Sequence, residues 1–291
     1  EVADGDYIKE TSLEFCKKQK LKEALIRSVD LIKSSSFDDV ASVINEAINL
    51  GSDNDIGYDY LLDFEERFVQ RSRNPVSTGW DFIDDIMKGG LGSGELGVVI
   101  APTGAGKSMA LAHLGARAVE NGKSVVHYTL ELADTVVASR YDSCITHVGL
   151  SDLIPLKEKI YEEVKGIEGH LIVKEYPTRS ATIQTIKNHL EKMSNRGVSP
   201  DLIIVDYADL IKPTSFKKEE KRHQLEAIYE ELRGISQIYE CPVWTASQTN
   251  RSGLNAEVIT MESISEAFNK CFVADFIFTL SRTVEDKTTN S

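Results

Sequence analysis

The chain has 291 residues, of which 41% are hydrophobic, and its formal net charge is −13 at pH 7. A chain of this length can bury one substantial core and carry a smaller appendage. Its acidic balance, with a pI near 5.0, argues against a protein that coats nucleic acid with a broad basic face. It does not exclude a protein that surrounds one strand of nucleic acid, because such a protein needs positive charge only along its channel.

Signals for membranes or export are not found in the sequence. No stretch approaches the roughly 18 consecutive apolar residues that a membrane span needs. The first residues, EVADGDYIKE, lack the basic and apolar parts of a secretory signal. We therefore expect a cytoplasmic protein with no membrane partner.

The cysteines indicate neither a zinc site nor a disulfide framework, because no two of them form a CxxC pair. Buried, reduced thiols are expected instead. The four cysteines are Cys16, Cys144, Cys241 and Cys271.

Residues 7–50 are predicted to be helical, within a helical segment that spans 1–52. Apolar residues at helical spacing run through both halves of this stretch. The second helix is expected to begin after an N-cap at Ser36 and to end at Gly51. The expected apolar stripe of the first helix is Leu13, Leu21, Ala24, Leu25, Ile26, Val29 and Ile32, and that of the second is Val40, Val43, Ile44, Ala47 and Ile48.

A linker with one short helix is predicted over residues 53–75. A polar break at 51–57 precedes the expected helix at 58–71, and Pro75 stops it. Large apolar side chains on so short a helix must be buried against its own chain or against a neighbouring subunit. The residues alone leave both possibilities open.

From residue 76 to the end, apolar runs of strand length alternate with helical segments. This alternation predicts an α/β domain with a mostly parallel central sheet and helices on both faces. The runs are GVVIA, SVVHYTL, HLIVKEY, DLIIVDY, PVWTAS and ADFIFTL.

Residues 101–108, APTGAGKS, fit the phosphate-binding P-loop, with alanine where the first glycine usually stands. They lie between a strand and a helix, so backbone N–H groups at the helix N-terminus would face an anion. Lys107 would meet the β- and γ-phosphates and the Ser108 hydroxyl would bind Mg²⁺. The alternative is a chance glycine turn, which this context argues against. The expected nucleotide-binding residues are Ala101, Pro102, Thr103, Gly104, Ala105, Gly106, Lys107, Ser108 and Met109.

Three later strand runs end in polar side chains that a nucleotide hydrolase needs. Asp206 ends the run LIIVD in the Walker B form and is expected to hold Mg²⁺ through water. Glu131 follows a second run and Gln248 ends a third, at the edge where ligands of open α/β sheets collect. Taken singly, Glu131 can also be an acid at a helix start, and Gln248 a loop amide. Together the three point to one site.

A charged loop, KPTSFKKEEKR at 212–222, directly follows the Walker B strand. In a ring it could face the channel and bind the phosphates of a nucleic-acid strand. A solvated charge run is the alternative, and its one aromatic residue, Phe216, is weak support for base stacking. The candidate contacts are Lys217, Lys218, Lys221 and Arg222.

Several spaced motifs resemble those of the DnaB-type replicative helicases, most closely the phage-encoded branch. Ahead of the P-loop the similar segments are VSTGW at 76–80, GGL at 89–91 and GEL at 94–96. TLEL at 129–132 resembles the family's Ser-Leu-Glu-Met, DYADL at 206–210 its Asp-Tyr-Leu-Gln-Leu, and SQTNR at 247–251 its Ser-Gln-x-Asn-Arg. The resemblance covers residues 76–282 and, more loosely, 7–71.

The resemblance implies a RecA-like P-loop ATPase that uses ATP and Mg²⁺. It implies that Glu131 activates water, that Arg140 contacts a phosphate and that Gln248 senses the γ-phosphate. It further implies a homo-hexamer assembled through the linker helix at 58–71, single-stranded DNA as the track, and primase and helicase-loader partners. If the chain is phage-encoded, its expected location is the cytoplasm of the host cell.

Departures from the family pattern concern DNA contact and chain ends. The family's DNA-facing loop corresponds to 264–269, where Ser265 stands at an arginine position of bacterial members, with Glu266 and Asn269 beside it. The family's Lys-x-Arg strand, which reaches the neighbour's ATP, has no counterpart before Ser291. The chain is therefore expected to be a fragment, with a helical remnant of an N-terminal domain and a C-terminally incomplete motor domain.

Two other functions share these features. A recombinase or clock-type ATPase on the same fold would carry the same P-loop, Walker B strand and strand-end glutamate. A nucleotide-binding interaction module without turnover would need only the phosphate cradle. The SQTNR element and the helical N-terminal segment favour a helicase over the first, and the complete set of polar strand ends argues against the second.

Overall fold

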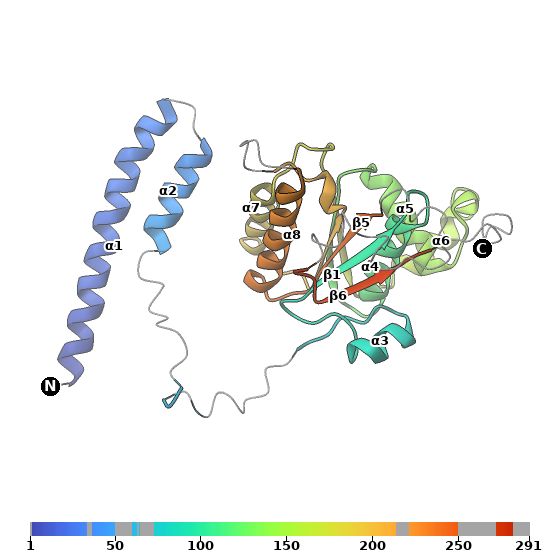
Figure 1. Ribbon diagram of the computed structural model, residues 1–291, viewed down its shortest axis with the longest axis horizontal. Coiled ribbons are helices and arrows are strands. Elements are labelled where there is room, and N and C mark those ends of the chain that lie inside the picture. The colour runs from blue at the N-terminus through green and yellow to red at the C-terminus, as the bar shows by residue number, and fades with distance from the viewer. Residues whose placement is uncertain are drawn as a thin grey trace. The chain divides into compact units, whose positions relative to one another are not determined.

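The computed structural model describes residues 2–33, 37–49, 60–62, 64, 73–213, 221–249 and 272–281. It divides into two compact units, Glu1–Arg71 and Ser72–Ser291, which are drawn together in Figure 1 and described separately below. None of the helices in these ranges is both long and apolar enough to cross a membrane.

The N-terminal unit contains two helices that pack together, α1 (Val2–Lys33) and α2 (Phe37–Asn49). Small side chains make the buried surface: Ala24 and Ala47 are 5% and 6% exposed, and the buried Ser28 hydroxyl donates to the Ala24 carbonyl at 2.7 Å. The predicted helices are thus confirmed, but most of the expected α1 stripe is not buried. Within the described residues, four of its members are at least half exposed: Leu25, Ile26, Val29 and Ile32.

Only Tyr60–Leu62 and Phe64 are described from the stretch where a linker helix was predicted. They lie in turns, and their side chains are 48% to 84% exposed. The rest of that predicted helix, and the predicted helix boundaries at Ser36 and Gly51, fall outside the described residues.

The C-terminal unit is built on a parallel sheet, and the predicted α/β class is confirmed. Within the described residues the sheet has six strands in the order β3-β2-β4-β5-β1-β6. Each strand coincides with one of the six apolar runs of the sequence. They are β1 (Leu96–Ala101), β2 (Ser124–Thr129), β3 (His170–Glu175), β4 (Leu202–Asp206), β5 (Val243–Gln248) and β6 (Phe276–Thr279).

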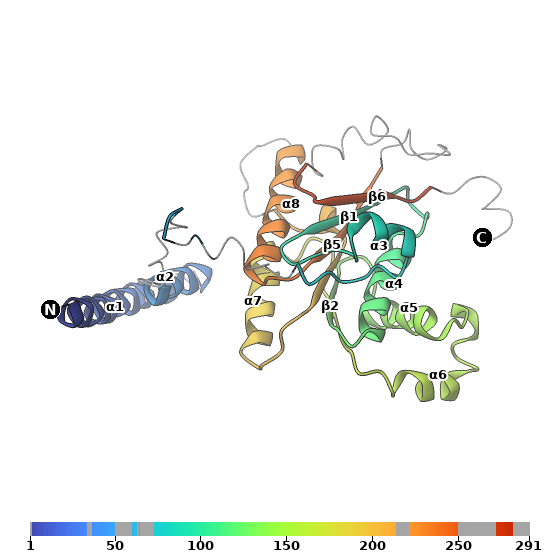
Figure 2. The same cartoon turned by 90° about the horizontal axis from the view of Figure 1, so that it is seen from below.

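Helices cover both faces of this sheet, as Figures 1 and 2 show. On one face lie α7 (Ile183–Ser194) and α8 (Lys221–Ile238), whose apolar residues share a core with the strands. On the other face α4 (Lys107–Glu120) packs on the sheet, with α3 (Asp81–Met87) beside it and α5 (Asp134–Thr146) against α4. The smaller elements are η2 (Leu150–Asp152), α6 (Lys157–Val164) and η3 (Ala208–Leu210).

An ion pair ties the start of this unit to the sheet. The Arg73 guanidinium lies 2.6 Å from Glu95, just before β1, and also donates to the carbonyls of Met87 and Gly90. The Glu95 pair raises the pKa of Arg73 above its usual value. Burial alone would raise the pKa of Glu95, but Arg73 and the Gly92 N–H outweigh it and lower that pKa. The pair therefore holds the glycine-rich segment before β1 in place.

Strand β2 carries a histidine whose side chain is almost completely buried. His127 is 1% exposed, its Nδ1 lies 3.0 Å from the Tyr141 hydroxyl of α5, and its Nε2 has no hydrogen-bond partner among the described residues. Burial, with a smaller effect from Arg140, lowers the pKa of His127 to about 3. The ring is therefore neutral in the folded chain.

This burial predicts a loss of stability in acid. Because the folded-state pKa is below the unfolded value of 6.5, the unfolded chain takes up a proton that the folded chain excludes. The resulting penalty is absent above pH 6.5 and grows as pH falls toward 3. Replacing His127 with Gln, whose amide can also hydrogen-bond to the Tyr141 hydroxyl, should reduce the stability loss between about pH 7.5 and about pH 4.5 by up to about 3 kcal/mol.

Urea unfolding at the two pH values measures this difference. The variant His170→Gln is the control, because His170 is exposed at the start of β3, and it should keep the wild-type pH dependence. Equal pH dependence in His127→Gln and wild type would contradict the role given to His127.

Candidate functional site

The parallel strands bring their carboxyl ends to one edge of the sheet. In the backbone register, Ala101 at the end of β1 lies beside Gln248 at the end of β5, and Thr129 at the end of β2 lies beside Asp206 at the end of β4. Ligands of open α/β sheets bind at this edge. The polar groups that follow these four strands are therefore neighbours in space.

The loop between β1 and α4 has the backbone of a phosphate cradle. Gly104 and Gly106 have φ angles of 77° and 99°, in the left-handed region that other residues rarely adopt. A Cβ added at either position would meet no atom within 4 Å, so the loop is open on the side that these positions face. The loop leads directly into α4, whose first N–H groups have no partners within the helix and favour an anion.

Lys107, the first residue of α4, is 7% exposed and turned back over the loop. Its ammonium group donates to the carbonyls of Ala101 and Pro102 at 3.3 and 3.1 Å. Burial lowers the pKa of Lys107, while the carboxylates of Glu131 and Asp206 act in the opposite direction. The loop carbonyls thus hold the ammonium group in place beside the cradle.

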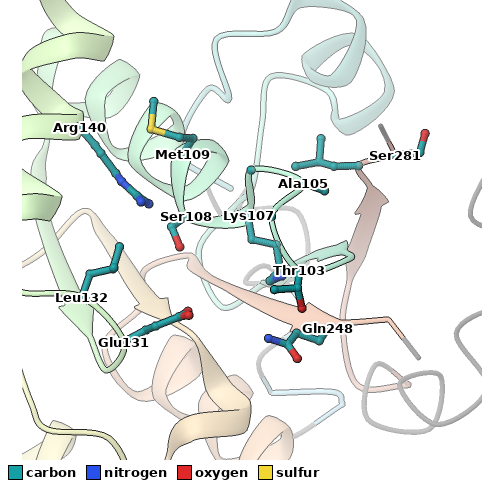
Figure 3. A pocket seen from close by; sticks show the side chains of 13 residues that line it. Thr103, Ala105, Lys107, Ser108, Met109, Glu131, Leu132, Arg140, Gln248 and Ser281 are labelled. Carbon is teal, nitrogen blue, oxygen red and sulfur yellow. The ribbon is translucent and has the colours of Figure 1, made fainter. Parts of the chain in front are cut away.

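A pocket of about 960 Å³ opens over this loop, within the usual size range of small-ligand sites. Figure 3 shows Lys107, Thr103 and Gln248 on one side of it and Glu131, Leu132 and Arg140 on the other. Arg140 comes from α5 and reaches toward Ser108. The lining residues are Thr103, Gly104, Ala105, Gly106, Lys107, Ser108, Met109, Glu131, Leu132, Arg140, Gln248, Leu280 and Ser281.

A hydroxyl fixes the turn that presents Glu131. The buried Thr129 side chain donates to the Leu132 carbonyl at 2.8 Å and accepts the Leu132 N–H at 3.2 Å. The Leu130 N–H donates to the Asp206 carbonyl at 2.8 Å. Because Leu130 and Leu132 are both held, the carboxylate between them is directed into the pocket.

Asp206 is the group whose surroundings fit a magnesium ion. The residue is 1% exposed, and neither carboxylate oxygen has a partner of good hydrogen-bond geometry among the described residues. Burial raises the pKa of Asp206, and the nearby Ser108 hydroxyl lowers it less. A buried carboxylate without partners beside a hydroxyl suits a hydrated Mg²⁺. The described residues contain no cluster of three or more His, Cys, Asp or Glu side chains that could hold a metal, so phosphates and water would complete its shell.

Gln248 meets a residue that the sequence did not single out. Its Nε2 donates to the Tyr207 hydroxyl at 3.0 Å, and Tyr207 directly follows Asp206. Burial, followed by the carboxylates of Glu131, Asp209 and Asp206, raises the pKa of Tyr207 to about 12. The hydroxyl is therefore protonated at neutral pH.

The structure gathers most of the expected nucleotide residues and leaves the expected DNA contacts open. Ala101 and Pro102 do not line the pocket, but their carbonyls accept from Lys107, and Asp206 is buried at the end of β4. Lys221 and Arg222 are in the first turn of α8, but their side chains are outside the described part. The other candidates fall wholly outside it, in 214–220 and 251–271: Lys217, Lys218, Ser265, Glu266 and Asn269.

Three residues that line or support the site were not predicted from the sequence. Leu280 and Ser281 follow β6, and their place at the end of a strand run is the signal that could have identified them. Tyr207 could have been suspected only from its position next to Asp206.

In the described part, Cys144 is half-buried and Cys241 buried, and both are unpaired.

Comparison with known proteins connects this site to one family. The model of the DnaB-like helicase C-terminal domain matches residues 75–258. The DnaB-like replicative helicase of Enterobacteria phage T4 is 29% identical over 260 residues, which cover 84% of this chain and 54% of that protein. The replicative DNA helicase DnaB of Helicobacter pylori (strain ATCC 700392 / 26695) is 24% identical over 182 residues, which cover 61% of this chain and 37% of that protein. The chain thus spans about half the length, or less, of these relatives.

Solved structures show the same fold at low sequence identity. One described as a DnaB-like replicative helicase and its interactions with primase has a TM-score of 0.73 and 14% identity, and covers 97% of this chain and 69% of its own. A second, described as an ATPase domain, has a TM-score of 0.63 and 14% identity, and covers 78% of this chain and 82% of its own. The α/β unit therefore has the same fold as these structures.

The geometry predicts that Lys107 is required for nucleotide binding. Lys107→Ala removes the ammonium group beside the cradle and should weaken ATP binding by about tenfold or more, since a charge-assisted contact is lost. Calorimetric titration with Mg·ATP measures the affinity, and circular dichroism checks the fold.

The control for this measurement is Lys123→Ala. Lys123 lies just before β2, at the opposite end of the sheet, in a half-exposed pair with Asp201 at 3.7 Å, and its loss should leave ATP affinity unchanged. A Lys107→Ala chain that folds and binds ATP as tightly as wild type would rule out the P-loop role.

Proposed function

The chain belongs to the DnaB-like helicases through its C-terminal domain, and on this premise we propose that its α/β unit is an ATP-hydrolysing motor that moves along single-stranded DNA and separates duplex strands. The observation that carries the proposal is the convergence of Lys107, Glu131, Arg140 and Gln248 on one pocket above the glycine loop. These four side chains supply a phosphate clamp, a base and a phosphate sensor within one site.

The phosphates of ATP would lie over the loop, with the N–H groups of the α4 terminus and the Lys107 ammonium facing them. Ser108 and, through water, Asp206 would hold Mg²⁺, which when bound offsets the charge of the β- and γ-phosphates. Bound Mg·ATP would counteract the lowered pKa of Lys107 and the raised pKa of Asp206. Anionic phosphate favours the charged form of Lys107, and a cation favours the charged form of Asp206.

Hydrolysis needs a water held in line with the γ-phosphate. Glu131 would accept its proton, a role supported by its place in the pocket wall and by the Thr129 turn, which holds the neighbouring Leu132 backbone. Arg140 faces the same space from α5 and would bind a phosphate oxygen. Gln248 lies across the pocket from Glu131, as Figure 3 shows, where its amide can register whether the γ-phosphate is present.

We infer that the working form is a ring of identical chains, most simply a hexamer, joined through the segment 58–71. The support is the exposure of Tyr60, Leu61, Leu62 and Phe64 in the described part of that segment, at 48% to 84%. Apolar side chains this exposed mark an interaction surface. The loop at 212–222 and the segment at 264–269 remain candidates for the DNA-facing surface. One structural relative is described with primase, so primase, together with a helicase loader, is a candidate partner in a cytoplasmic replication complex.

Strand displacement on a forked duplex tests the proposed function directly. Wild type should release the labelled strand only with Mg²⁺ and ATP, and single-stranded DNA should raise its ATPase rate. Glu131→Gln should bind ATP with wild-type affinity but lower kcat by about 100-fold or more, since proton transfer by a positioned base contributes that much.

The outcomes separate the competing functions. DNA-stimulated ATPase with filament formation and strand exchange, but no displacement, would replace the helicase with a recombinase. ATP binding with no turnover would leave a nucleotide-binding module. Equal ATPase rates for wild type and Glu131→Gln would remove Glu131 from its role.

A further inference from the structure

The ends of β4 and β5 separate at the point where the nucleotide site begins. The two strands pair only as far as Val205 and Thr245. Beyond that pair the Thr245 hydroxyl takes the place of a backbone partner: it donates to the Val205 carbonyl at 2.8 Å and accepts the Ala208 N–H at 3.1 Å. Asp206 and Tyr207 can therefore turn away from β5 while remaining fixed to it.

The next link between the strand ends is made by side chains. The Gln248 amide at the end of β5 donates to the Tyr207 hydroxyl at 3.0 Å. Tyr207 is itself well held, since it is 7% exposed and packs in the apolar core under the sheet edge. A rotatable amide that lines the pocket is thus anchored to a phenol that does not move freely.

We infer that Tyr207 is the positioning residue of Gln248, an assignment that rests on the proposed role of Gln248 as the phosphate sensor. A hydroxyl can accept one hydrogen bond and donate another, and a primary amide offers two N–H groups and one carbonyl. In the structure the amide donates to Tyr207. When an N–H of the Gln248 amide turns to a phosphate oxygen, the amide carbonyl can instead accept a hydrogen bond from the Tyr207 hydroxyl. The same hydroxyl therefore holds the amide in both states.

The packing of Tyr207 holds its hydroxyl beside Gln248 in both states, since the residue is 7% exposed and lies in the apolar core. A phenylalanine at 207 would keep the packing and remove only this partner.

A second tyrosine, Tyr229, links α8 to the segments that carry Tyr207 and Gln248. The Tyr229 hydroxyl of α8 lies 3.1 Å from the Asp209 carboxylate of η3 and 3.2 Å from the Ala246 carbonyl of β5, the two acceptors to which it can donate. Because η3 directly follows Tyr207 and Ala246 lies two residues before Gln248, α8 holds the backbone next to both partners of the Gln248–Tyr207 hydrogen bond. Tyr207 and Gln248 therefore keep their separation.

The test is Tyr207→Phe in the full chain, with Tyr239→Phe as the matched control. Tyr239 also loses one hydroxyl contact, 3.2 Å to the Lys187 carbonyl, away from the pocket. Tyr207→Phe should lower the kcat of ATP hydrolysis by about tenfold with KM and ATP affinity within about twofold, the effect of one hydrogen bond that matters after binding. Combined with Gln248→Ala it should lower kcat no further. Tyr239→Phe should match wild type.

A readout independent of activity accompanies the kinetics. In chains labelled with ¹⁵N-glutamine, the Gln248 side-chain amide signal, identified by its loss in Gln248→Ala, should shift in Tyr207→Phe and stay in place in Tyr239→Phe. An unmoved signal would overturn the anchor, whatever the ATPase rate. Additive kcat losses in the double variant, or a wild-type kcat in Tyr207→Phe, would overturn it as well. A shifted signal in Tyr207→Phe, together with no ATP hydrolysis by the wild-type chain, would count against the proposed motor and leave the anchor standing.

Discussion

The parallel pairing of β1, β5, β4 and β2 is the constraint on which the site depends. Parallel strands end at the same edge, so Ala101 meets Gln248 and Thr129 meets Asp206 without any long loop to bring them together. The cradle, the buried carboxylate of Asp206, the proposed base Glu131 and the proposed sensor Gln248 are separated by many residues in sequence, yet each lies at the end of a strand in this sheet or directly after it. A shift in register by one residue would turn every one of these side chains to the other face.

The electrostatics of the site follow from the same burial. The ammonium of Lys107 and the carboxylate of Asp206 are both withdrawn from water at the strand ends, and burial shifts the pKa of each away from the charged form. A phosphate and a cation would supply compensating charge. A magnesium-bound anion is one ligand that would do this, because it would bring an opposite charge to each of the two buried groups.

Local pattern was enough to predict what repeats along the chain. The six apolar runs identified the strands, and APTGAGKS between a strand and a helix located the cradle. For α1 the predicted stripe is confirmed only in part, because Ala24 is buried, as is Ser28 outside the stripe, while four larger members of the stripe stay exposed. Local pattern could not find Tyr207, Leu280 or Ser281, because their role comes from which strand ends are neighbours across the sheet. Strand order is a tertiary property that periodicity does not carry.

The proposed nucleotide site lies at the carboxyl edge of this sheet, over the loop at 102–106, and a crystal structure of the chain with Mg²⁺ and a non-hydrolysable ATP analogue tests it. The β- and γ-phosphates are expected within hydrogen-bond distance of Lys107 and the N–H groups at the start of α4, the cation beside Ser108, and the Gln248 amide turned toward the γ-phosphate. A nucleotide bound elsewhere, with none over the loop, would show that this edge of the sheet is not the nucleotide site.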